Sequence, residues 1–146
     1  MSTHAAVFIK NDDGTYTGTE ICNDGYIEIV NKFGKTTSIG AGYILQTYWT
    51  NRNEVEKLVK NNAVRNLGYD YESTEFYDWR QNILNSLSFQ ELKELGCQYI
   101  YIFNNRNEWW VMNNCSNNYE GMLLELKCFL DHDDPDGFID DDSFWN

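Results

Sequence analysis

The sequence predicts a single α+β domain built on a mainly antiparallel sheet, in the order βββ–αα–ββ–α, with its helices packed on one face. Two regions, residues 5–30 and 97–112, are rich in aromatic and β-branched residues and are interrupted by Asn, Asp and Gly, which is typical of strands joined by turns. Between them, apolar residues recur at helical spacing. With 146 residues, 42% of them hydrophobic, the chain is large enough for one core without disulfides.

The first third is predicted to form an antiparallel meander. An apolar run over residues 5–9 ends at the turn cluster 11–14, and residues 15–22 continue as a second strand. Asn23-Asp24-Gly25 is a second hairpin signal, because type I′ turns favour Asp-Gly, and residues 26–30 then supply the third strand. The glycine-containing residues 34–42 are expected to form a loose connection.

Helices are predicted in the middle third. Residues 50–53 offer capping side chains, and Val55, Leu58 and Val59 follow on one helical face. A second helix is expected over residues 73–87. Ser88-Phe89-Gln90-Glu91 then fits a capping box that begins a short helix, which ends at Gly96.

The last third returns to strand and ends in an acidic segment. Residues 97–103 and 108–112, joined by the turn 104–107, are predicted to form a hairpin. Residues 119–130 carry a helical apolar stripe, although alternation at Leu124, Leu126 and Cys128 leaves a strand open. We therefore divide the chain into a domain over residues 1–130 and an acidic segment with aromatic anchors over residues 131–146.

Most of the negative charge lies in that C-terminal segment. The formal net charge is −12, and residues 131–142 hold seven aspartates and no Lys or Arg, which leaves −5 for the remainder. Phe138 interrupts these carboxylates and Phe144 and Trp145 follow them, so these aromatic residues could anchor the segment. This excess of negative charge argues against direct binding of nucleic acid or of an anionic membrane surface, and no apolar run is long enough to span a membrane.

Several short motifs of the sequence are similar to motifs of a known protein family. They are Met1-Ser2-Thr3, Asp13-Gly14-Thr15-Tyr16, Asp24-Gly25-Tyr26, Ile44-Leu45-Gln46-Thr47-Tyr48, Leu67-Gly68, Tyr99-Ile100-Tyr101-Ile102-Phe103 and Trp109-Trp110-Val111. On these motifs the chain resembles, as a divergent member, a family of small uncharacterised proteins of tailed bacteriophages, over residues 1–112. It departs from the family where Cys22-Asn23 replaces His-Trp and where His4 replaces Arg. The resemblance implies a phage accessory protein in the host bacterial cytoplasm, and it implies no activity.

The sequence shows no constellation that supports catalysis, a metal or a cofactor. Its two histidines, His4 and His132, lie at opposite ends of the chain, and no Ser/His/Asp arrangement is visible. The four cysteines form no C-x-x-C pair and are expected to be reduced thiols. A calcium loop aligned on Gly137 fails at its first and twelfth positions, which are His132 and Ser143.

We therefore expect a binding protein that inhibits a basic host protein, such as a nucleic-acid-handling defence enzyme. Carboxylates can occupy the positions that phosphates take against a Lys/Arg groove. Trp109 and Trp110 are adjacent and so point to opposite sheet faces, which leaves Trp110 either covered or available as an interface anchor. The partner-binding residues expected are Asp133, Asp134, Asp136, Asp140, Asp141, Asp142, Trp145 and Trp110.

The alternative hypothesis, from another class, is a small-ligand module. In it, aromatic residues on the sheet would stack a nucleotide, with a pocket formed at a homodimer interface.

Overall fold

The centre of the fold is an antiparallel pair, β1 (Ala5–Lys10) and β2 (Tyr16–Ile21), with Ala5 opposite Ile21 and Lys10 opposite Tyr16. The structure is a computed structural model, and it describes residues 4–30, 36–78, 84–114 and 122–130. The turn between the strands closes at Gly14, whose φ of 87° lies in the left-handed region that glycine tolerates best.

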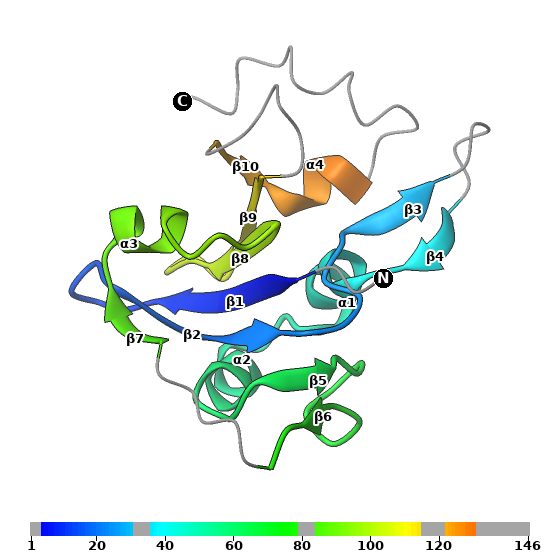
Figure 1. The fold of residues 1–146 in the computed structure, drawn as a ribbon, viewed down its shortest axis with the longest axis horizontal. Helices are drawn as coiled ribbons and strands as arrows, with labels where there is room; N and C mark the ends of the chain where they lie inside the picture. The colour runs from blue at the N-terminus through cyan, green and yellow to red at the C-terminus, as the bar shows by residue number, and fades with distance from the viewer. Residues whose placement is uncertain (1–3, 31–35, 79–83, 115–121, 131–146) are drawn as a thin grey trace.

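The main sheet extends from both sides of this pair (Figure 1). On the β1 side follow β8 (Tyr99–Phe103), parallel to β1, then β9 (Trp109–Asn113) and β10 (Leu123–Glu125), each antiparallel to its neighbour. On the β2 side lie β5 (Val64–Asn66), parallel to β2, and β7 (Leu84–Leu87), antiparallel to it, with β6 (Glu75–Phe76) outside β5. The eight-stranded sheet is thus mainly antiparallel, as the sequence predicts.

Helices cover both faces of this sheet, so the prediction that they pack on one face is wrong. One apolar cluster joins Val7 and Ile9 of β1 to α1 (Ala41–Tyr48), α2 (Arg52–Val59) and α4 (Leu126–Leu130). The other joins Ala6 and Phe8 to Leu92 of α3 (Phe89–Lys93). The physical reason lies in β1, where five consecutive residues are at most 2% exposed, so both faces of the strand need cover.

The predicted meander has only two of its three strands. Asp24 does adopt a turn conformation, with φ of 56°, but the chain then forms β3 (Glu28–Val30), which pairs with β4 (Thr36–Ile39) in a separate two-stranded sheet. The carbonyls of Asp24, Tyr26 and Ile27 accept hydrogen bonds from the first amides of α1 instead of from a neighbouring strand. These contacts satisfy the helix N-terminus and draw the segment away from β2.

The prediction of a helix over residues 73–87 is also wrong. Its described parts are β6 and β7, and residues 79–83 lie outside the described residues. Leu84 and Leu87 pair with Gly18 and Tyr16 of β2, and this pairing partly buries their side chains against the apolar cluster beside α3. Tertiary pairing therefore overrides a local helical spacing.

Other predictions are confirmed. Asn51 caps α2 by accepting hydrogen bonds from Asn53 N and Glu54 N, and Ser88 and Glu91 form the expected capping box of α3. The β8–β9 hairpin forms as predicted. For residues 119–130 the sequence allows either a helix or a strand, and the described residues 122–130 contain a short strand followed by a short helix. None of the helices in the described ranges is long and apolar enough to cross a membrane.

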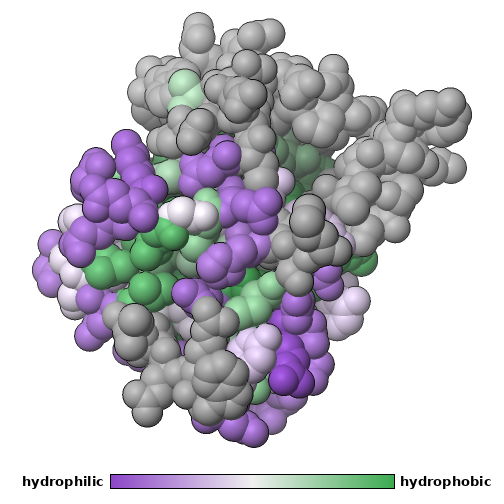
Figure 2. Space-filling model, in the orientation of Figure 1, coloured by the Kyte–Doolittle hydropathy of each residue, from purple (hydrophilic) through white to green (hydrophobic). Residues whose placement is uncertain are grey.

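The second apolar cluster reaches the surface beside α3. Figure 2 shows apolar residues gathered there and framed by hydrophilic ones. The partly buried members of this cluster are Leu84, Leu87, Phe89, Leu95 and Leu123. The acidic segment over residues 131–146, by contrast, lies outside the described residues.

Candidate functional site

Of the residues predicted to bind a partner, only Trp110 lies in the described part of the chain. Asp133, Asp134, Asp136, Asp140, Asp141, Asp142 and Trp145 all lie outside it.

The two adjacent tryptophans of β9 lie on opposite sheet faces, as predicted. Trp109 is 4% exposed and belongs to the cluster under α1, α2 and α4. Trp110 is partly buried, and its Cα is paired with Ile102 on one side and Glu125 on the other. Trp110 Nε1 is buried and has no acceptor within the described ranges, which leaves one polar atom of this ring unsatisfied there.

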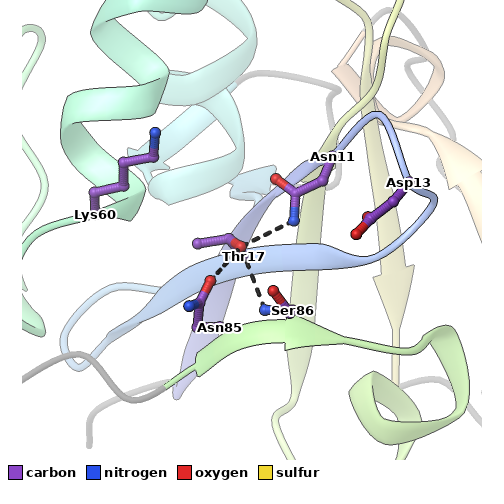
Figure 3. A pocket seen from close by; sticks show the side chains of 6 residues that line it. All are labelled: Asn11, Asp13, Thr17, Lys60, Asn85 and Ser86. Carbon is purple, nitrogen blue, oxygen red and sulfur yellow. Dashed lines mark hydrogen bonds between the residues drawn. The ribbon is translucent and has the colours of Figure 1, made fainter.

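A polar pocket of about 510 Å³ lies elsewhere, where the β1–β2 turn, the end of α2 and β7 meet (Figure 3). Each of the described residues that line it is polar or charged. They are Asn11, Asp13, Thr17, Lys60, Asn85 and Ser86.

Thr17 is the centre of the hydrogen bonds that hold this pocket. Its Oγ1 accepts from Asn11 Nδ2 at 2.9 Å and from the Ser86 backbone N–H at 3.4 Å, and it donates to Asn85 Oδ1 at 2.9 Å (Figure 3). Ser86 has φ of 55°, at the point where the β2–β7 register shifts. The irregular pairing thus turns the backbone N–H of Ser86 toward Thr17 instead of along a regular ladder.

One carboxylate and one ammonium group line the pocket. The hydrogen bonds that Thr15 donates, first from its side chain and then from its backbone, lower the pKa of Asp13 below its ordinary value and stabilise the carboxylate form. Lys60, the C-cap residue of α2, has an exposed side chain and makes no ion pair with the described residues. Figure 3 shows it on the opposite side of the pocket from Asp13.

The chemistry available here is hydrogen bonding. The described residues of the lining include neither His nor Cys. Within the described ranges, no group of three or more His, Cys, Asp and Glu residues is arranged to hold a metal ion. The pocket suits a small polar molecule with both acceptors and donors.

Sequence reasoning missed this pocket. Its residues come from the turn at 11–13, from β2, from the end of α2 and from β7, and the sequence predicts a helix in place of β7. In the sequence, Asn11 and Asp13 indicate only a turn. Thr17 and Asn85 are 68 positions apart, and no local spacing indicates that so distant a segment completes the site.

Comparisons with protein-family models, with curated proteins and with solved structures found no match to this chain.

Proposed function

We propose that this chain is an accessory protein of a tailed bacteriophage that binds and inhibits a basic host protein in the bacterial cytoplasm. A nucleic-acid-handling defence enzyme is the kind of target that fits. Binding, not catalysis, is its role in this proposal, and it uses no cofactor.

The observation that carries the proposal is an excess of exposed negative charge. The chain has 23 acidic and 11 basic residues. The only buried polar residues in the described ranges are Thr17, Thr19 and Thr74, so every carboxylate whose burial is described reaches the surface. Lys and Arg neutralise few of them: the Lys and Arg ion pairs there are Arg52–Glu56, Lys57–Glu54 and Lys127–Glu125.

Such a surface favours a cationic partner. Complementary charge speeds association and disfavours partners of the same sign, and nucleic acid is one of these. The aspartates of residues 131–142 add a dense block of the same charge, with Trp145 nearby and Trp110 on the sheet as apolar anchors.

The test is affinity capture from a bacterial lysate with the full chain and with a variant carrying Asp→Asn at 133, 134, 136, 140, 141 and 142. The expected result is salt-sensitive capture of a discrete protein with a basic surface, lost in the variant. The captured enzyme is then purified and assayed with and without the full chain. Equal capture by both proteins argues against a role of the acidic segment in partner binding. Capture without any loss of the enzyme's activity argues against inhibition.

A second candidate function, a small-ligand module, is favoured by the polar pocket. The described residues that line it include no aromatic side chain, so none of them offers a ring on which a nucleobase would stack. A sugar or another small hydrogen-bonding molecule suits it better than a nucleotide.

A thermal-shift screen of nucleotides and monosaccharides tests this alternative. Stabilisation by one compound that Asn85→Ala abolishes supports it, whereas a flat response at millimolar ligand argues against it. Light scattering on the same samples tests whether the chain forms the homodimer that this alternative includes.

A further inference from the structure

Two exposed tyrosines lie in contact on the surface. The large hydrophobic side chains exposed in the described ranges are Ile39, Tyr48 and Tyr69. Tyr48, at the end of α1, and Tyr69, in the loop after β5, are 49% and 54% exposed, and their ring centroids are 4.7 Å apart with planes inclined by 59°. Single exposed apolar residues are ordinary, but two touching aromatic rings concentrate such surface at one place.

The pair is held in place by the residues beside it. Trp49 is 1% exposed, and its Nε1 donates a 3.0 Å hydrogen bond to the carbonyl of Gly68. This bond joins the residue after Tyr48 to the residue before Tyr69. On the loop side, Gly68 N donates to Thr74 Oγ1 at 3.1 Å, and Thr74 Oγ1 donates to the carbonyl of Asp70 at 2.7 Å. The backbone on both sides of Tyr69 is therefore fixed before any partner binds, which lowers the entropic cost of binding.

The charged residues of the segment that carries Tyr69 are all acidic. Residues 66–78 include no Lys or Arg, and α1 carries no charged residue. Hydrogen bonds from Ser73, first from its side chain and then from its backbone, lower the pKa of Asp70 below its ordinary value and stabilise its carboxylate form. The exposed carboxylates of this segment are Asp70, Glu72, Glu75 and Asp78.

Tyrosine rings in the same region already hold cations. Lys57 Nζ lies 5.8 Å from the ring centroid of Tyr71, and the Arg65 guanidinium lies 4.9 Å from that of Tyr77. No Lys or Arg of the described residues lies over Tyr48 or Tyr69. These two rings are therefore available to a cation from another molecule.

We propose that Tyr48, Tyr69, Asp70 and Glu72, the tyrosine surface, dock an arginine-bearing segment of a basic partner protein. This inference rests on the proposed function, which makes the partner basic. Arginine fits better than lysine, because a planar guanidinium stacks on an aromatic face while it donates hydrogen bonds to a carboxylate.

The probe is a fluorescein-labelled peptide of alternating arginine and serine, compared with its lysine counterpart of equal length by fluorescence anisotropy. Each is titrated with the full chain and with the Asp→Asn variant of the acidic segment, because that segment can attract the same peptides. Tyr48→Ala with Tyr69→Ala removes the rings, and Tyr48→Phe with Tyr69→Phe retains them. Glu72→Gln removes one exposed charge from the surface, and Asp12→Asn removes a matched exposed charge elsewhere.

The alanine pair is expected to weaken binding of the arginine peptide about tenfold in both backgrounds and to abolish its advantage over the lysine peptide. The phenylalanine pair is expected to bind as the unmodified chain does, and Glu72→Gln to weaken binding more than Asp12→Asn. Both tyrosines are about half exposed, so these variants should keep the circular dichroism of the unmodified chain.

Unchanged binding of the arginine peptide by the alanine pair would contradict docking at the tyrosine surface, but it would not contradict the proposal that the partner is basic. Complete loss of binding when the acidic segment alone is neutralised would likewise overturn the tyrosine surface and not the basic partner. If the unmodified chain binds neither peptide, both the surface and the preference for basic partners are overturned.

Discussion

The Nε1 of Trp109 donates a hydrogen bond of 2.8 Å to the main-chain carbonyl of Trp49 and so ties β9 to the end of α1. The indole of Trp49 in turn donates to Gly68, so two buried rings connect the sheet, the helix and the loop that carries Tyr69. The position of the tyrosine surface thus depends on the core beneath it.

Trp109→Phe is expected to lower the free energy of unfolding by about 1–3 kcal/mol, because it leaves the Trp49 carbonyl buried without its donor. Urea denaturation measures this difference. Trp110→Phe is the matched control on the same strand, since its Nε1 has no acceptor among the described residues. Trp110→Phe should lower the free energy of unfolding clearly less than Trp109→Phe does. An equal decrease in the two variants would show that the hydrogen bond from Trp109 to Trp49 does not stabilise the fold.

Gly18→Ala is expected to destabilise the fold by about 3 kcal/mol, because its Cβ would overlap the carbonyl of Val7 and the ring of Phe8, both fully buried. Gly14→Ala is the contrast. A Cβ there meets nothing within 4 Å, and only its φ of 87° opposes it, at a cost of about 1 kcal/mol. Thermal unfolding of both variants checks the order, and a larger loss at Gly14 would contradict it.

The parts of the fold that depend on local signals could be predicted from the sequence. The capping side chains of Asn51 and Ser88 act within one helical turn, and the β8–β9 hairpin depends on neighbouring segments, so each is visible in a short window. The parallel pairing of β1 with β8 joins segments more than 90 residues apart, as with Ala5 and Tyr99, and no short pattern indicates it.

The failures have the same origin. The sequence does not predict α1, because Gly40 and Gly42 lower the helix propensity at its start. The fold requires glycine there, since a Cβ at either position would collide with Tyr26 or Ile27, against which the helix start packs. The pocket around Thr17 is missed because the local spacing of its strand β7 favours a helix. The predicted acidic site lies outside the described residues, except for Trp110, so it stays a prediction.

Ser88→Ala is expected to lower the free energy of unfolding by about 1 kcal/mol, because Glu91 N then loses the hydroxyl that caps it at 3.2 Å. That corresponds to a fall in Tm of about 4 °C, measured by circular dichroism. Ser88→Asn supplies another capping acceptor and should recover most of the loss. A similar Tm for all three proteins would show that the cap contributes nothing.

Burial, and to a smaller extent the charge of Glu20, raises the pKa of the Cys97 thiol from its ordinary 9.0 to about 11. Between these values the unfolded chain has lost the thiol proton while the folded chain retains it, so stability falls as pH rises through this window and is unaffected below it. Urea denaturation at a series of pH values measures this, with Cys97→Ala as the control for Tyr and Lys residues that titrate in the same range. The expected result is that the stability difference between the unmodified chain and the variant is constant up to pH 8 and shrinks above pH 9. A difference that stays constant to pH 11 would show that Cys97 titrates as an exposed thiol does.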